Sequence, residues 1–175
     1  MGSHDIRRHA AEEGGVMIRP IYIFDLDGTL ALNEHRQHFV TGSGKKDWKS
    51  FFNALDDDAP NHGVIETMRT LRKTCHVWIW TGRPEEYKEK TLDWLMNHKI
   101  IDNRQSRFWY REPNRFRMRR TGDNTKDYLL KQSWLHSLPE AYLNKIVGVF
   151  DDRQSVVDMW RSNGITCFQV AKGDF

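Results

Sequence analysis

The sequence has few of the features that mark membrane, secreted or disulfide-bonded proteins. No apolar stretch approaches the ~20 residues that a helix needs to cross a bilayer, and no segment shows the charged and then apolar pattern of a secretion signal. Only two cysteines occur, Cys75 and Cys167, and their spacing is not that of a metal site. We therefore expect a cytoplasmic protein with no membrane partner, whose cysteines are small core residues of a reducing compartment.

A site for ATP is also missing. The segment from Phe39 to Lys46 is the nearest match to a phosphate-binding loop. Phe39 stands where such a loop has glycine, however, and Lys46 stands where a serine or threonine would hold Mg²⁺. The chain contains no internal repeat and no low-complexity tract. We therefore expect a non-repetitive fold without an ATP site.

What is present fits one globular domain. The chain has 175 residues, of which 38% are apolar and 29% charged, and its net charge is only +3. Residues 1–16 show no apolar periodicity, so we interpret them as a leader or vector remnant and Met17 as the natural start. The expected domain therefore runs from 17 to 175.

The chain is organised around a short apolar run that leads into two carboxylates. Residues 21–24 read Ile-Tyr-Ile-Phe, which is typical of a buried strand, and Asp25, Asp27 and Gly28 follow. Alternation along the strand direction places Asp25 and Asp27 on the same side of the chain. Two like charges this close need a cation, or a proton on one of them. An Asp-rich turn is the simpler explanation for such a pair on its own, so the other strands must be considered.

Two further predicted strands also end in polar residues. Residues 75–80 lead into Thr81, Gly82 and Arg83, and residues 145–150 lead into Asp151 and Asp152. Helices are predicted between the strands, at 61–73, 84–98 and 154–163, which favours a parallel sheet. Open parallel sheets bind ligands at the carboxyl ends of their strands. The pattern therefore predicts one site at that edge, which includes Asp151 and Asp152, with their individual roles left open.

Three other features are candidates on spacing alone. Asp123 and Asn124 can cap a helix that runs to about Ser137, and this helix would place Asp127 and Lys131 on one face. Lys126 is the alternative to Lys131 as the lysine of the site. Arg36 lies in a polar segment at 31–60, where a solvated loop charge is the simpler explanation. The stretch 104–120 has seven arginines against one acid and contains aromatic residues, which suits either nucleic acid or a surface loop around a short edge strand.

The first motif, Phe-Asp-Leu-Asp-Gly-Thr-Leu, resembles that of the haloacid dehalogenase superfamily of phosphohydrolases. The resemblance implies a three-layer, Rossmann-like α/β fold with a mostly parallel sheet and a small helical, cap-like insertion at 31–60. It implies that Asp25 is the nucleophile, Asp27 the general acid and base, and Thr81 a ligand of a phosphate oxygen. It also implies a Mg²⁺ ion, and the metal ligands expected are Asp25, Asp27 through its backbone carbonyl, Asp151 and Asp152.

From about 20 to 175 the chain is similar to the 3′-phosphatase domains of phage polynucleotide kinase/phosphatases. The motifs that carry the similarity are Asp25-x-Asp27-Gly28 with Arg36, Thr81-Gly82-Arg83, Gly122 to Asp127 with Lys131, Asp151-Asp152-Arg153, and the tail from Val156 to Phe175. The similarity implies a catalytic Lys131. It implies substrate-binding roles for Arg36, Gly82, Arg83, Arg119 and Asp127. Thr81 replaces the serine of the phage enzymes, which keeps the hydroxyl. The phage enzymes have a kinase domain before the phosphatase, and we expect none here.

The sequence as a whole predicts a Mg²⁺-dependent polynucleotide 3′-phosphatase that works through a phosphoaspartate. The expected partners are 3′-phosphorylated DNA or RNA ends and a separate kinase or ligase, with the oligomeric state left open. One alternative is a 5′(3′)-nucleotidase that acts on free nucleoside monophosphates. The other is a catalytically silent nucleic-acid-binding module that uses the stretch 104–120.

Overall fold

Five parallel strands form the centre of the computed structural model, which describes residues 18–104, 106 and 112–173. Their order across the sheet is β5-β4-β1-β6-β7, and the four pairings between them are all parallel. The first strand of the chain is therefore the central one, which confirms the parallel sheet expected from the sequence. The strands are β1 (Ile21–Phe24), β4 (His76–Pro84), β5 (Phe116–Arg119), β6 (Ile146–Arg153) and β7 (Cys167–Gly173).

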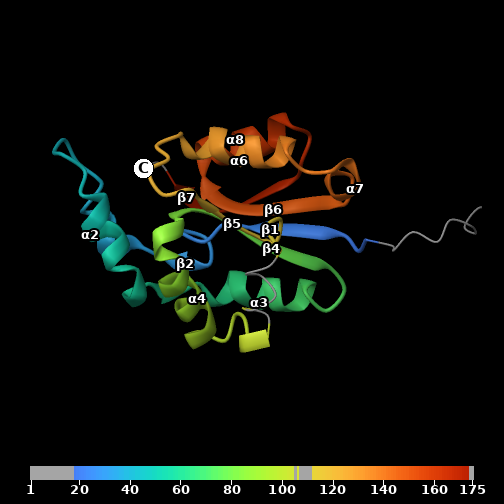
Figure 1. The fold of residues 1–175 in the computed structure, drawn as a ribbon, viewed down its shortest axis with the longest axis horizontal. Coiled ribbons are helices and arrows are strands. Elements are labelled where there is room, and N and C mark those ends of the chain that lie inside the picture. The colour runs from blue at the N-terminus through green and yellow to red at the C-terminus, as the bar shows by residue number, and fades with distance from the viewer. Residues whose placement is uncertain (1–17, 105, 107–111, 174–175) are drawn as a thin grey trace, which may run out of the picture.

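Helices cover both faces of this sheet (Figure 1). One face carries α3 (His62–Leu71) and α4 (Lys88–Asn97). The other carries α6 (Asp127–His136), α7 (Glu140–Leu143) and α8 (Gln154–Ser162). Strand β1 supplies both interfaces because its side chains alternate: Phe24 packs into the core on the α3 side, whereas Ile21 and Ile23 pack into the core on the α8 side. The expected three-layer α/β fold is confirmed.

Tryptophans fill much of the core between the sheet and α8. Trp80 of β4 lies 5.8 Å from Trp160 of α8 and 5.9 Å from Trp134 of α6, measured between ring centroids. Val156, Val157 and Trp160 are buried at helical spacing, as the apolar pattern of 154–163 predicts. This packing fixes α6 and α8 against the sheet and so fixes the residues that these helices bring to its edge.

Residues 31–60 leave the sheet after β1 and return before α3. The segment begins with β2 (Ala31–Leu32) and ends with β3 (Ala59–Pro60), and these two strands pair in antiparallel fashion. Between them lie α1 (Glu34–Gln37), α2 (Trp48–Asn53) and the 3₁₀ turn η1 (Leu55–Asp57). Asp47 caps α2 by accepting a hydrogen bond from the Ser50 N–H at 3.0 Å. In Figure 1 α2 stands beyond the edge of the sheet, beside β2.

One prediction about a helix start was wrong. Helix α6 begins at Asp127, after Lys126, and neither Asp123 nor Asn124 caps it. The Asp123 carboxylate instead accepts a hydrogen bond from the Thr125 N–H at 2.8 Å, which forms a local turn. Competition between turns and caps for the same Asp side chain explains the error.

Other expectations fall partly outside the described residues. Those on residues 1–16 lie outside them, as do those on 105 and 107–111 in the arginine-rich stretch. The described end of that stretch contains β5, an edge strand of the sheet. Cys75 and Cys167 are free thiols, Cys167 buried and Cys75 partly exposed. No helix in the described ranges combines the length and apolar character that a bilayer crossing requires.

Candidate active site

The carboxyl ends of β1 and β6 bring three aspartates together. Asp25 directly follows β1, and its N–H donates to the Phe150 carbonyl at 2.9 Å, which ties it to β6. Asp151 and Asp152 are the sixth and seventh residues of β6. One carboxylate oxygen of each of the three aspartates lies within 4.8 Å of the others, and all three residues are buried. Neighbouring parallel strands thus bring Asp25 next to Asp151 and Asp152, although more than a hundred residues separate them in the sequence.

Lys131 supplies a buried positive charge to this cluster. It lies one turn into α6 and is 1% exposed. Its ammonium donates to Asp25 Oδ1 at 2.6 Å and to Asp151 Oδ2 at 2.9 Å, and lies 3.6 Å from Asp127 Oδ2. The competing Lys126 is exposed. One ammonium does not neutralise this many carboxylates, so the cluster keeps an excess of negative charge.

The pKa values of the cluster reflect that excess. Burial raises the pKa of Asp25 well above its usual range against the opposing charge of Lys131, and the other carboxylates raise it further. Burial and the charge of Asp151 raise the pKa of Asp152 to about 7. Burial would lower the pKa of Lys131, but Asp151, Asp25 and Asp127 outweigh it and hold that pKa well above its usual range. The lysine is therefore a permanent cation, whereas part of the acidic set holds protons when no cation is bound.

The residues present fit a divalent cation. The three aspartates offer only oxygen ligands, which is the donor type that Mg²⁺ requires, and the charge excess favours a cation. Asp151 already accepts hydrogen bonds from Lys131 and, at 3.2 Å, from the Arg153 N–H. The Asp27 carboxylate is engaged elsewhere, so its part in metal binding stays the predicted one, through the backbone carbonyl.

Metal binding should therefore stabilise the domain in a pH-dependent way. Native Asp152 keeps its proton up to about pH 7, whereas an unfolded aspartate loses it near 3.9. Stability contributed by this group consequently falls as pH rises through that window. Bound Mg²⁺ needs the ionised form, so it should raise the melting temperature more at pH 8 than at pH 5.5. Calorimetric scans with and without Mg²⁺ measure this; an equal increase at both pH values would contradict it.

Gly28 leaves room for the Asp152 carboxylate. Its φ of +80° lies in the left-handed region, and a Cβ built on it would overlap that carboxylate. Gly28→Ala should therefore displace Asp152 and weaken Mg²⁺ binding by about tenfold or more, a size that changes in the surroundings of metal ligands commonly have. Titration calorimetry measures the affinity. Gly122→Ala is the matched control, because Gly122 has a φ of +79° but nothing within 4 Å of its built Cβ.

A second buried cluster surrounds Asp27. Arg83 donates to the Asp27 carboxylate through Nε at 3.0 Å and Nη2 at 2.6 Å, and Arg36 donates through Nη2 at 2.5 Å. Both guanidiniums also bind Asp58: Arg36 Nε at 2.6 Å and Arg83 Nη2 at 2.7 Å. Burial would raise the pKa of Asp27, but the two arginines outweigh it and hold that pKa at about 2. Asp27 is therefore ionised in the free protein near neutral pH.

Asp58 is a residue of this site that the sequence analysis missed. It is 2% exposed, and its backbone carbonyl accepts a hydrogen bond from Trp94 Nε1 at 2.9 Å. In the sequence it is the last of three successive aspartates at 56–58, a pattern typical of a solvated turn. No local signal distinguishes it from the two exposed aspartates before it. Its role becomes visible only when the insertion folds back onto Arg83.

Gly82, Arg119 and Asp127 line the pocket of the site, and Thr81 lies buried next to Gly82. Thr81 is fully buried, and its hydroxyl oxygen accepts a hydrogen bond from the Arg83 N–H at 3.2 Å. Arg119 of β5 donates to the Gly82 carbonyl at 3.0 Å, to the Thr125 carbonyl at 2.5 Å and to Asp127 at 3.3 Å. A Cβ on Gly82 would lie 2.6 Å from Asp127 Oδ1, so glycine allows this close approach. Arg119 thus organises the 122–127 segment around the site.

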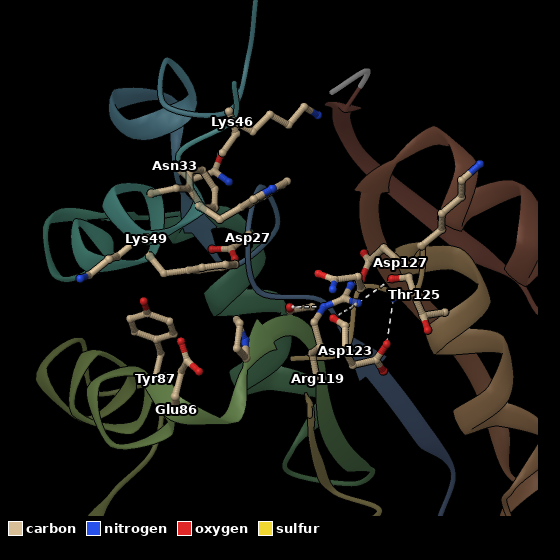
Figure 2. Close-up of a pocket in the computed structure, with 18 of the residues that line it drawn as sticks. Asp27, Asn33, Lys46, Lys49, Glu86, Tyr87, Arg119, Asp123, Thr125 and Asp127 are labelled. Atoms are coloured by element: carbon tan, nitrogen blue, oxygen red, sulfur yellow. Dashed lines mark hydrogen bonds and ion pairs between the residues drawn. The ribbon is translucent and has the colours of Figure 1, made fainter. Parts of the chain in front are cut away.

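These residues meet at a pocket of about 590 Å³. Figure 2 shows Asp27 between the insertion on one side and Arg119, Asp123, Thr125 and Asp127 on the other. Asp25, Asp152 and Gly82 also line it. Arg36 and Arg83 lie wholly buried, and their direct contact with substrate stays a prediction. The structure therefore brings most of the predicted site residues into two adjoining clusters at one edge of the sheet, with Thr81, Gly82 and Arg119 beside them.

Comparison with known proteins identifies the family. The family model of the polynucleotide kinase PNKP phosphatase domain matches residues 19–175. The chain belongs to this family. The expected haloacid dehalogenase-type phosphatase is thereby confirmed. An Autographa californica nuclear polyhedrosis virus protein, named as a bifunctional polynucleotide kinase/RNA ligase, is 30% identical to this PNKP-type domain over 152 residues. That match covers 85% of the chain and 19% of the viral protein.

Solved structures give the same result. Two structures of the Pnkp1/Rnl/Hen1 complex, one named as an RNA repair complex, align with TM-scores of 0.68 and 0.67 at 27% identity. They cover 99% of this PNKP-type domain, which spans 53% and 48% of the matched chains, about half their length. A protein named as a phosphatase from Clostridium difficile aligns over 87% of the chain with a TM-score of 0.52 at 13% identity, which shows the shared fold.

Proposed function

We propose that the domain is a Mg²⁺-dependent polynucleotide 3′-phosphatase that works through a phosphoaspartate on Asp25. The observation that carries the proposal is the hydrogen bond of 2.6 Å from Lys131 to Asp25, beside a cluster of acids suited to a metal, in a pocket shared with Asp27. A nucleophilic carboxylate needs a nearby cation to approach an anionic phosphate. Family membership supports a nucleic-acid end as the substrate.

In the proposed first step an Asp25 oxygen forms a bond to phosphorus while the bond from phosphorus to the 3′-oxygen breaks. Asp25, Asp151 and Asp152 would hold Mg²⁺, which when bound offsets negative charge on the phosphate. Lys131 stabilises the carboxylate and the phosphoryl oxygens, together with the Thr81 hydroxyl. Asp27 passes to the departing 3′-oxygen a proton that it takes from the phosphate monoanion. In the second step water attacks the phosphoaspartate, Asp27 removes its proton, and inorganic phosphate leaves.

The low pKa of Asp27 determines where the proton comes from. Because Arg83 and Arg36 keep this carboxylate ionised, it cannot bring a proton to the first step from the free protein. A phosphate monoanion carries one, and it loses it with a pKa of about 6. With Mg²⁺ saturating at each pH, kcat/KM should therefore fall about tenfold for each pH unit above that value. A steady-state pH profile measures this, and a flat profile from pH 6 to 8 would exclude substrate as the proton source.

The proposal is tested by substrate preference. Phosphate release is measured from a 3′-phosphorylated oligonucleotide and from the matching nucleoside 3′- and 5′-monophosphates, with Mg²⁺ present. Higher kcat/KM for the oligonucleotide is the expected result. Turnover of the monophosphates that is at least as fast would instead assign the domain to free-nucleotide hydrolysis. RNA and DNA versions of the oligonucleotide identify which kind of end it prefers.

We further propose that residues 17–175 act as one phosphatase domain with 31–60 as its small cap. Its relatives bear the names of a kinase/ligase and of a Pnkp1/Rnl/Hen1 complex. These names support a kinase or ligase as a working partner, and a ligase would join the 3′-hydroxyl ends that the phosphatase leaves. Co-purification with a ligase from the same source tests the association.

A further inference from the structure

One wall of the active-site pocket is aromatic, and the proposed phosphate chemistry gives these side chains no role. Trp48 and Phe52 of α2 and Tyr87 of η2 (Glu85–Tyr87) line it. The Trp48 and Phe52 rings are stacked, with centroids 6.0 Å apart and planes at 23°, and Phe52 lies 5.2 Å from Tyr87. We refer to these three side chains as the aromatic shelf. It lies in the same pocket as Asp25 and Asp27.

The outer end of the aromatic shelf is open. Trp48 is 46% exposed, and no other tryptophan is among the large exposed apolar residues of the described ranges. It is nevertheless held in place, because its ring also contacts the buried Phe51 edge-on at 5.7 Å. A rigid, half-exposed indole at the rim of a polar pocket offers a flat π surface for a ligand at little cost in side-chain entropy.

Two lysines of the insertion accompany this surface in the pocket lining. Lys46 Nζ lies 5.6 Å from the centre of the Trp48 ring, and Lys49 also lines the pocket. In Figure 2 the Lys46 side chain extends outward from the insertion, on the same side of the pocket as Asn33. Lys126 and Arg153 also line the pocket and add positive charge, whereas Glu86 and Asp123 add negative charge. The pocket mouth therefore combines an aromatic face with groups that attract phosphate.

A buried donor on the insertion side of the pocket is unpaired. Asn33 is 1% exposed and lines the pocket, and its Oδ1 accepts a hydrogen bond from Gln37 Nε2 at 3.1 Å. Its Nδ2 has no hydrogen-bond partner within the described part of the chain. An unsatisfied buried donor is unfavourable unless a ligand accepts from it. Sugar hydroxyls and phosphate oxygens are both suitable acceptors.

We propose that the aromatic shelf is the binding site for the base of the 3′-terminal nucleotide. In this arrangement the base stacks on Trp48, Asn33 Nδ2 donates to the sugar or its phosphate, and Lys46 and Lys49 lie near the next backbone phosphate. The proposal rests on the proposed 3′-phosphatase function and deepens it. Every base has a π face, so the shelf recognises a nucleotide without selecting a sequence.

The test compares Trp48→Ala with the parent on substrates that do or do not carry the base. One oligonucleotide has a normal 3′-phosphorylated end, a second has an abasic 3′-phosphorylated end, and p-nitrophenyl phosphate is the generic monoester. Removing Trp48 should lower kcat/KM for the normal end about tenfold, mainly through KM, as expected for the loss of one stacked base. On the abasic end the parent should already show that loss, and Trp48→Ala should add little to it.

Two further variants complete the design. Trp48→Phe keeps an aromatic face and should retain most of the activity on the normal end, which separates stacking from bulk. Leu143→Ala is the matched control, because Leu143 is a large exposed apolar residue on α7 that does not line the pocket. A nucleoside 3′-monophosphate has the base but no further backbone phosphate, so Trp48→Ala should lower its kcat/KM as well.

The outcomes separate the two proposals. Equal losses for Trp48→Ala on normal and abasic ends, or no loss on either, would overturn the stacking site while leaving the phosphatase function in place. If the parent hydrolyses p-nitrophenyl phosphate but not the normal oligonucleotide end, the proposed function fails instead. If Trp48→Ala does not fold, the comparison of normal with abasic ends on the parent and on Trp48→Phe still decides the inference.

Discussion

Replacing Asp25 by asparagine is expected to lower kcat by about 10⁴-fold or more, as removal of a nucleophile does in enzymes that work through a covalent intermediate. The amide retains an oxygen that can accept the hydrogen bond from Lys131, so the packing of the site is preserved. It cannot form the acyl phosphate. Phosphate release from the 3′-phosphorylated oligonucleotide measures the loss.

The same substitution should leave the fold intact. Burial raises the pKa of Asp25, which means that the folded state disfavours its charge, and a neutral amide removes that penalty together with repulsion from Asp151. Thermal unfolding should therefore show an unchanged or higher melting temperature near neutral pH. Asp158→Asn, at an exposed position of α8, is the control for a charge change on the surface. If Asp25→Asn keeps activity within tenfold of the parent, the assignment of Asp25 as nucleophile is wrong.

Among the substitutions considered, replacing Lys131 by methionine is expected to lower the free energy of unfolding most. It removes a fully buried ammonium and leaves Asp25 and Asp151 buried without their cation. Breaking a buried pair on one side commonly costs about 3–5 kcal/mol of unfolding free energy. Without Lys131 these carboxylates are protonated in the folded state, so the deficit should shrink as pH is lowered from 7.5 towards 5. Denaturant unfolding at the two pH values measures both effects.

Lys126→Met is the matched control for this experiment. Lys126 precedes α6 and is exposed, so its loss should change the unfolding free energy by no more than about 0.5 kcal/mol. Activity of Lys131→Met is measured at pH 5, where most of the protein is expected to be folded, to separate a catalytic loss from unfolding. A variant that is as stable as the parent at pH 7.5 would show that Lys131 does not neutralise the acidic cluster.

The sheet and the acidic cluster were predictable because each depends on local patterns that tertiary structure only brings together. Apolar runs that end in Asp25, Thr81 and Asp151 predict three strands, and the rule that parallel strands share an edge then predicts their proximity. Lys131 was harder to predict, because a lysine one turn after an acid is usually a surface ion pair. Its place depended on the resemblance to a family, and the structure puts it in the core of the site.

The rest depended on contacts that no local pattern encodes. Asp58 looks like a solvated residue until the insertion returns to the sheet and sets it against Arg36 and Arg83. Two arginines of the 104–120 stretch, Arg117 and Arg119, have different roles that the sequence does not distinguish. Arg117 packs over Trp80 at 4.9 Å and bonds the Trp134 carbonyl, so it braces the core, whereas Arg119 reaches the pocket. Composition treats both as equivalent positive charges.

The four-membered cluster of Asp27, Arg36, Asp58 and Arg83 has a consequence for the whole insertion. Arg36 and Asp58 belong to residues 31–60, whereas Asp27 and Arg83 belong to the ends of β1 and β4. The ionisation of the residue proposed to exchange protons is therefore set partly by a segment outside the sheet. Any displacement of that segment removes a cation from Asp27 and raises its pKa. The charge state of Asp27 and the position of residues 31–60 therefore depend on each other.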